Sequence, residues 1–204
     1  MSQVTSGIRA ILSHPIVYTT FQNLMGARSG SQRIVSEYIR PEPGMRVLDI
    51  GCGPAAILEY LPEVEYWGFD ISEAYIAAAR KGFGKQGRFV CRLLTKDALS
   101  SLPPFDLVLA LGLLHHLDDA AAVEFFKLAH MALKPKGRLV TVDPCLEEGQ
   151  NPVARILIKM DRGQNVRTRP EYDALASSRF QTRLVTVRHS TWIPYTHCIM
   201  ECTR

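Results

Sequence analysis

Long apolar runs, paired cysteines and repeats are all missing from this sequence. No apolar stretch in the 204 residues reaches the length of a membrane span, and Ser13, His14 and Pro15 interrupt the N-terminal apolar positions. We therefore expect no signal peptide, no membrane span and a cytoplasmic location. The five cysteines form no Cys-x-x-Cys pair, which argues against a disulfide framework and a zinc site. Without repeats or a long linker, the chain is expected to form a single domain over residues 1–204.

Charge is modest overall but unevenly distributed. The net charge is +4, yet residues 1–150 hold 15 basic and 16 acidic groups, whereas residues 151–204 hold 9 and 4. A basic C-terminal quarter favours an anionic small-molecule substrate or a membrane surface. A solvated basic face explains the same count equally simply, so both interpretations stay open.

The apolar pattern alternates between strand-length and helix-length segments. Such alternation predicts a parallel sheet that helices cover on both faces. Two helices within residues 1–40, the first ended by Gly26 and the second opened by Ser31, would form an N-terminal cap. Strands are expected at 47–50, 66–70, 88–94, 105–111 and 138–142, with helices at 55–61, 73–81, from 118 or 119 to 133, and near 152. Two final strands, 182–188 and 197–203, have no helix between them and should pair antiparallel.

The first strand ends in a turn rich in small residues. Asp49, Gly51 and Gly53 fit the pattern Asp-x-Gly-x-Gly-x-Ala, which leads from the strand directly into a helix. Such a turn brings backbone N–H groups and the positive end of a helix dipole close to a ligand. The pattern resembles the first motif of class I methyltransferases that use S-adenosylmethionine (SAM). Residues 105–117, FDLVLALGLLHHL, resemble the fourth motif of the small-molecule type 11/12 group of these enzymes. The resemblance covers residues 35–204 and implies an α/β fold: a seven-stranded, mostly parallel Rossmann-like sheet with a C-terminal antiparallel hairpin.

The resemblance also assigns residues to the cofactor. In such enzymes the first motif holds the amino acid end of SAM, and a carboxylate at the end of the second strand binds the ribose hydroxyls. Ala55 departs from the pattern, which commonly has glycine there. Asp97 resembles the residue that meets the adenine amino group, although a loop or helix-capping aspartate is an equal alternative. The implied cofactor-binding residues are Tyr18, Arg28, Asp49, Gly51, Cys52, Gly53, Asp70, Ile71, Asp97, Leu111 and Gly112.

Two histidines follow the fourth strand, where the resemblance places the reactive methyl. His115 or His116 could remove a proton from an attacking hydroxyl or amine, or could simply hold the loop by bonding a backbone carbonyl. Adjacent histidines on a loop are poor chelators, so no metal is expected. An insertion over residues 144–180 would cover the substrate. The expected substrate-binding residues are Asp143, Arg167, Tyr195 and His197.

The predicted reaction is methyl transfer to an O, N or C nucleophile of a small molecule. Nucleic acid is an unlikely substrate, because the fourth motif lacks the Asp/Asn-Pro-Pro-aromatic run of enzymes that methylate bases. Two alternatives remain: residues 51–56 also fit the Gly-x-Gly-x-x-Ala turn of a nicotinamide-dependent dehydrogenase, and a non-catalytic SAM-binding domain would show the same first motif. The sequence leaves the acceptor and the oligomeric state open.

Overall fold

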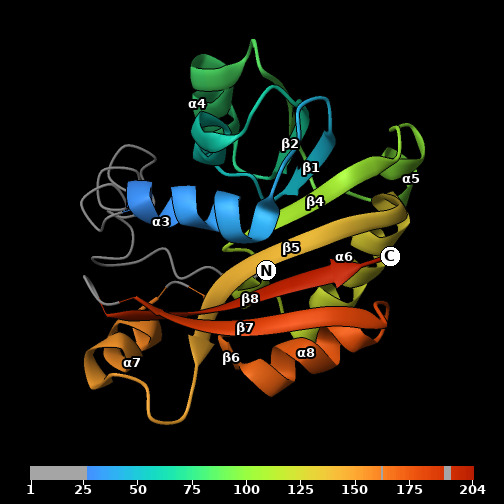
Figure 1. Cartoon of the computed structure of the whole chain (residues 1–204). Coiled ribbons are helices and arrows are strands. Elements are labelled where there is room, and N and C mark those ends of the chain that lie inside the picture. The colour runs from blue at the N-terminus through green and yellow to red at the C-terminus, as the bar shows by residue number, and fades with distance from the viewer. Residues whose placement is uncertain (1–26, 162, 191–193) are drawn as a thin grey trace.

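A mixed seven-stranded sheet organises the chain, with a short eighth strand beside it (Figure 1). The computed structural model describes residues 27–161, 163–190 and 194–204, so the helix expected to end at Gly26 lies outside the described residues. The sheet order is β3-β2-β1-β4-β5-β8-β7, and β6 pairs with β5 off this path. The strands are β1 (Arg46–Ile50), β2 (Glu65–Asp70), β3 (Gly87–Cys91), β4 (Phe105–Leu111), β5 (Leu133–Leu146), β6 (Arg167–Thr168), β7 (Thr182–Ser190) and β8 (Tyr195–Thr203).

Strand direction follows the prediction from the apolar pattern. The first five strands pair parallel, whereas β8 pairs antiparallel with both β5 and β7. The expected C-terminal hairpin is therefore confirmed. Because β1, β4 and β5 run the same way, their carboxyl ends meet at one edge of the sheet, which is where ligands bind in open α/β folds.

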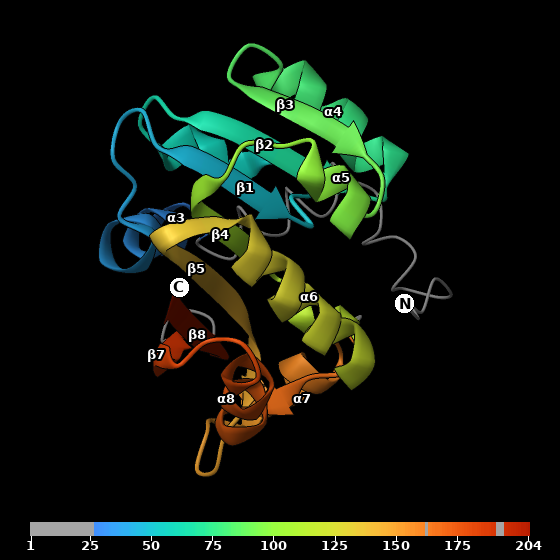
Figure 2. The ribbon, with the colours of Figure 1, turned by 90° about the vertical axis from the view of Figure 1, so that its right-hand side faces the viewer.

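Helices cover both faces of the sheet (Figure 2). Figure 2 shows α3 and α6 on opposite sides of β4, and two separate apolar clusters account for this arrangement. One cluster joins α5, α6 and α8 to the sheet, and the other joins η1, η2 and α4 to its opposite face. The helices are α3 (Ala27–Ile34), η1 (Val35–Ile39), η2 (Ala56–Tyr60), α4 (Glu73–Phe83), α5 (Lys96–Ser100), η3 (Leu114–His116), α6 (Asp119–Ala132), α7 (Pro152–Lys159) and α8 (Arg169–Ser177).

Local capping explains where several helices begin. Ser72 accepts a hydrogen bond from the Tyr75 amide before α4, and Asp118 accepts one from the Ala121 amide before α6. Asn151 caps α7 in the same way. Each of these polar side chains immediately precedes the first residue of its helix, where it satisfies an amide that has no partner within the helix.

Three boundaries differ from the sequence prediction. Helix α3 is already formed at Ala27, whereas the prediction starts this helix at Ser31. Strand β3 ends at Cys91 rather than at residue 94; Leu94 is still buried, but it packs on the core from a loop. Residues 134–137, which the prediction leaves between a helix ending at 133 and a strand starting at 138, are instead an irregular part of β5. This strand begins at Leu133, with a register shift against β4 and a positive φ at Lys136. The short elements α5, β6 and α8 were not predicted, since α5 and β6 are too brief to show a period and α8 is more polar than apolar.

Candidate cofactor and active site

The glycine-rich turn lies between the ends of β1 and β2. Gly51 and Gly53 have positive φ values of 75° and 53°, which glycine adopts readily. The amides of Gly51 and Cys52 both donate to the Phe69 carbonyl, so the turn is fastened to β2. The Cys52 side chain is buried against the sheet at Gly68. Open space remains at Gly53, where no protein atom lies within 4 Å of the position of a Cβ.

Ala55 ends the turn in an unusual conformation. Its φ of 57° and ψ of 32° are left-handed, and the residue is completely buried. A left-handed alanine costs roughly 1–2 kcal/mol, which the burial of its methyl group partly offsets. This geometry explains why glycine is common here in the family pattern and why alanine is nevertheless accommodated.

Asp49 is a buried carboxylate with one oxygen still available. The Tyr66 hydroxyl donates to Asp49 Oδ2 at 2.6 Å, whereas Oδ1 is buried without a hydrogen-bond partner among the described residues. Burial raises the pKa of Asp49 to about 6, against the opposing effect of the Tyr66 hydrogen bond. An unsatisfied buried carboxylate oxygen is costly, and a cationic ligand group at this position would relieve the cost.

Asp70 holds the turn and the start of the next helix together. Its two carboxylate oxygens accept hydrogen bonds from the amides of Gly53 at 2.9 Å and Ser72 at 2.8 Å. An ionised carboxylate has further lone pairs, so these bonds leave capacity for ribose hydroxyls. The adjacent Ile71 is 54% exposed, as a surface for an aromatic ring requires. Asp97 is exposed in the first turn of α5, which Thr95 rather than Asp97 caps.

The remaining predicted cofactor residues divide into two groups. Leu111 ends β4 and Gly112 turns the chain with a φ of 75°, its amide donating to the Val142 carbonyl at 2.7 Å. Both therefore lie at the carboxyl edge beside the glycine-rich turn. Arg28 belongs to α3, but its side chain is not described, and Tyr18 lies outside the described residues.

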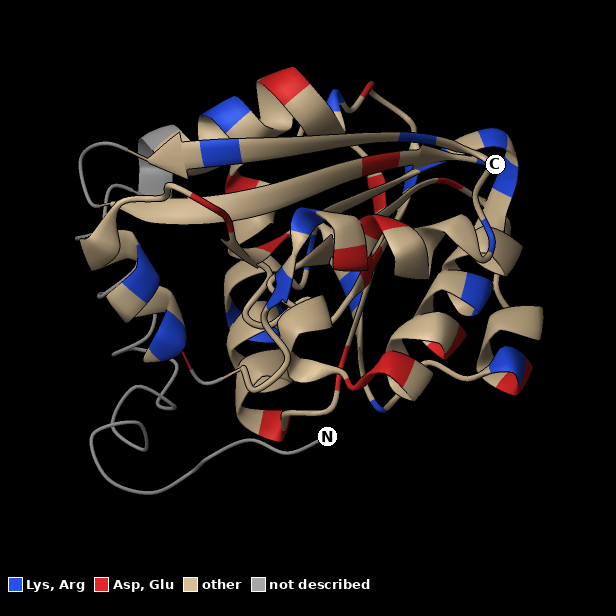
Figure 3. Ribbon diagram, turned by 90° about the horizontal axis from the view of Figure 1, so that it is seen from below, with Lys and Arg blue, Asp and Glu red and all other residues tan. Residues whose placement is uncertain are grey.

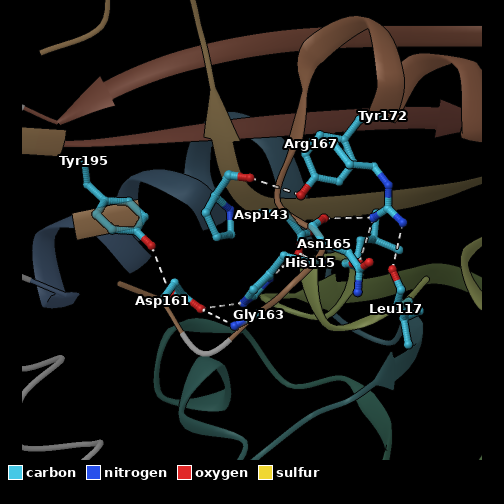
Figure 4. Close-up of polar contacts among 11 residues, drawn as sticks. His115, Leu117, Asp143, Asp161, Gly163, Asn165, Arg167, Tyr172 and Tyr195 are labelled. Carbon is cyan, nitrogen blue, oxygen red and sulfur yellow. Dashed lines mark hydrogen bonds and ion pairs between the residues drawn. The ribbon is translucent and has the colours of Figure 1, made fainter. Parts of the chain in front are cut away.

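His115 lies between two carboxylates (Figure 4). Its Nδ1 is 2.8 Å from Asp143 Oδ1 at the end of β5, and its Nε2 is 3.2 Å from Asp161 Oδ1 in the segment after α7. Burial alone would lower the pKa of His115, but the two carboxylates outweigh it and raise the pKa to about 9. The same contacts hold the pKa of Asp161 well below its ordinary value, against the opposing effect of burial.

The segment after α7 packs directly on His115. The Asn165 amide donates to the His115 carbonyl, and the Gly163 amide donates to Asp161 Oδ1. A Cβ at Gly163 would overlap the His115 ring and approach its carbonyl oxygen, so glycine alone fits here. Sequence reasoning missed both Asp161 and Gly163 as site residues. The only signal was a polar, glycine-broken stretch, which names no partner.

Arg167 is bound entirely within the protein. Its guanidinium donates to the carbonyls of Leu114 and Leu117, which flank the histidine pair, and to the carbonyl of Asn165. It also contacts Asp119 Oδ1 at 2.7 Å. The side chain is buried, and these bonds occupy its donors. The structure therefore places this predicted substrate-binding residue behind the histidine loop, where it holds that loop to β6.

The hairpin brings two predicted substrate residues to the same site. The Tyr195 hydroxyl donates to Asp161 Oδ2 at 3.1 Å, and the Tyr195 and His197 ring centroids lie 4.9 Å apart. Burial lowers the pKa of His197 to about 4, so this imidazole is neutral near pH 7. The His116 ring centroid lies 4.0 Å from that of His115. Asp143, Tyr195 and both candidate histidines thus lie in one group around Asp161.

Comparisons with known proteins agree with this geometry. Residues 48–139 match a sequence family described as a methyltransferase domain. The crystal structure of the apo S-adenosylmethionine-dependent methyltransferase SibL has a TM-score of 0.71 to this chain at 17% identity, covering 96% of this chain and 61% of SibL. Residues 48–139 therefore match a methyltransferase domain, and the fold of the chain is that of SAM-dependent methyltransferases.

Two further relatives extend the comparison. The ubiquinone biosynthesis O-methyltransferase of Bradyrhizobium diazoefficiens is 35% identical over 100 residues, which cover 48% of this chain and 39% of that protein. Human N-acetylserotonin methyltransferase in complex with SAM has a TM-score of 0.57 at 20% identity, covering 77% of this chain and 47% of that chain. The chain thus spans well under half the length of the curated relative it matches.

SAM is the cofactor of this methyltransferase domain, and the residues at the sheet edge fit it. The unpartnered oxygen of Asp49 suits its ammonium group, Asp70 suits its ribose hydroxyls, and Gly53 leaves room beside the backbone. In the part of the chain that the structure describes, no three His, Cys, Asp or Glu side chains form a group that could hold a metal ion. In that part, no helix combines the length and apolarity needed to cross a bilayer.

The His115 contacts predict a pH-dependent stability. Because the folded pKa of about 9 exceeds the ordinary 6.5, this stabilisation is complete below pH 6.5 and is lost as the pH rises through 9. The free energy of unfolding in urea should fall over this range by up to about 3 kcal/mol. The Asp161→Asn variant should show a shallower fall, because one carboxylate is gone. If the free energy of unfolding fell equally steeply with pH in both proteins, the assignment of this fall to His115 would be contradicted. The buried cysteine thiols are the same in both proteins, so their contribution cancels when the two curves are subtracted.

Proposed function

We propose that this domain transfers the methyl group of SAM to a hydroxyl oxygen of a small molecule, with His115 as the general base. The observation that supports this most directly is the 2.8 Å contact between His115 Nδ1 and Asp143, at the same sheet edge as the glycine-rich turn. A carboxylate on Nδ1 fixes the ring and leaves Nε2 to act on the acceptor. The name of the Bradyrhizobium relative, an O-methyltransferase, supports oxygen as the acceptor atom.

The acceptor hydroxyl would replace Asp161 at Nε2 of His115. Loss of that carboxylate contact lowers the pKa of His115, so the imidazole becomes a base in the pH range where it must accept a proton. The acceptor O–H proton then passes to Nε2 while the oxygen forms its bond to the methyl carbon. SAM, when bound, would supply that methyl group, and the electron pair of the broken sulfur–carbon bond would stay on its sulfur. Holding oxygen and methyl in line would contribute about 7–11 kcal/mol.

Residues 144–180 are proposed to cover the substrate. This segment supplies Asp161 and Gly163 to the His115 side of the site, and β8 supplies Tyr195 and His197. The carboxylates around His115 favour a neutral hydroxyl, such as a phenol, over the anionic acceptor that the basic C-terminal quarter suggested. In this proposal His116 lines the site beside His115.

A transfer assay with labelled SAM tests the proposal. The full chain would be incubated with matched panels of phenols, amines and carboxylic acids, and the products identified by mass spectrometry. We expect label on the oxygen of a phenol or another neutral hydroxyl. Methylation confined to amines or carbon would refute the oxygen assignment. SAM binding without turnover across the panel would favour the non-catalytic alternative.

Asp70 offers a separate prediction for cofactor binding. Asp70→Asn should weaken the affinity for S-adenosylhomocysteine by about tenfold to a hundredfold, since a hydrogen bond to a charged group contributes about 1.5–3 kcal/mol. Isothermal titration calorimetry measures this directly. Glu73→Gln, an exposed neighbour in the first turn of α4, is the matched control and should bind normally. An unchanged dissociation constant for Asp70→Asn would remove the ribose assignment.

A further inference from the structure

An apolar stripe runs along the outer face of α7. Val153, Ile156 and Met160 are 52%, 58% and 62% exposed, and their spacing of three and four residues places them on one side of the helix. The opposite side is anchored: Ala154 and Ile158 are buried where α7 packs on β5 and β8. Because the inner side of α7 is packed in this way, the exposure of the three apolar side chains does not result from a loosely packed helix. Apolar side chains that lie exposed next to one another on a single face mark a candidate interaction surface.

Basic residues flank this stripe. Arg155 and Lys159 are exposed, lie one turn apart, and project beside the apolar side chains. Helix α7 contains no acidic residue, and Figure 3 shows it with basic positions in blue and none in red. Two of the nine basic residues of 151–204 thus lie on a helix that also exposes apolar side chains. This combination is typical of interfacial helices, in which basic side chains reach anionic headgroups while apolar side chains enter the lipid.

We propose that the outer face of α7 binds the surface of an anionic lipid membrane. Charge complementarity favours this occupant, because anionic headgroups pair with both Arg155 and Lys159 beside the apolar stripe. The placement has a consequence for the site. Helix α7 ends two residues before Asp161, whose carboxylate contacts His115, so membrane binding would bring the acceptor side of the site close to the lipid.

Vesicle co-sedimentation of the full chain tests this proposal. At low ionic strength we expect binding to mixed phosphatidylcholine–phosphatidylglycerol vesicles, and much weaker binding to phosphatidylcholine alone. The Val153→Ser/Ile156→Ser double variant should lose at least about tenfold in partitioning. Arg155→Gln and Lys159→Gln should each lose about fivefold. Leu184→Ser is the matched control, since Leu184 is 60% exposed on β7 and should leave binding unchanged.

Several outcomes would overturn the proposal. One is failure of the unaltered chain to bind the anionic vesicles, and another is an equal loss for the Leu184→Ser control. If light scattering showed a dimer that the double variant converted to a monomer, with no vesicle binding, the stripe would be an interface between two copies. Thermal unfolding of each variant verifies that the exposed substitutions leave the fold intact. Vesicle binding is measured without methyl transfer, so its result is independent of the proposed activity.

Discussion

Replacing His115 by asparagine is expected to lower kcat by about 10²–10⁴-fold, the usual contribution of a general base. The asparagine amide can still donate to Asp143 in place of Nδ1, so the loop should keep its position. It offers no group of comparable basicity at the position of Nε2. The dissociation constant for SAM should change little, because His115 contacts Asp143 and Asp161 rather than the glycine-rich turn.

The matched control for this variant is His116→Asn. Both residues belong to η3 and their rings are in contact, so a general disturbance of the loop would affect both variants equally. We expect the larger loss of turnover at His115. A loss carried only by His116→Asn would move the base to that residue, and full activity of both variants would end the base hypothesis. Steady-state kinetics at saturating SAM, with SAM binding measured separately, distinguishes these results.

Replacing Arg167 by methionine should destabilise the fold by about 3 kcal/mol, because removing one partner of a buried charged network leaves the others unsatisfied. The carbonyls of Leu114 and Leu117 would lose their donors while remaining inside the protein. Urea unfolding monitored by circular dichroism measures the loss. Arg179→Met is the control, since Arg179 is exposed and should change stability by less than about 0.5 kcal/mol.

The Arg167→Lys variant separates positioning from stability. Lysine keeps the charge but cannot donate to three carbonyls in the fixed planar geometry of arginine. If Arg167 positions the histidine loop, this variant should lower kcat more than it raises the KM for SAM, at a temperature where it is fully folded. Unchanged kcat in folded Arg167→Lys would reduce Arg167 to a purely structural residue. A selective increase in the acceptor KM would instead return it to the predicted role in substrate binding.

Local sequence signals predicted the elements that create the sheet edge. The apolar run through residue 50, the glycines after it and the cap at Ser72 each act within a few residues, so the strand, turn and helix follow from local physics. The same reasoning placed Asp70 and Gly112 at the edge, because parallel strands end together. It misjudged the end of β3, since Leu94 is buried without being paired in the sheet.

The surroundings of His115 could not be predicted in this way. Asp161 reaches His115 from 46 positions along the chain, and that approach depends on how α7 packs against the C-terminal hairpin. Arg167 could be recognised as a functional candidate, but most of its partners are backbone carbonyls, which leave no trace in the sequence. Contacts between distant segments therefore determine the ionisation of the proposed base.

The fit of Gly163 against His115 has a consequence for engineering this domain toward bulkier acceptors. Even the smallest side chain at position 163 would collide with the imidazole, so a library randomised there should return glycine among its active members. Position 161 lies two residues away, and its side chain contacts Nε2 of the histidine, the atom that the proposal assigns to the acceptor. Directed evolution of acceptor range should therefore begin at 161 and leave the neighbouring glycine codon untouched.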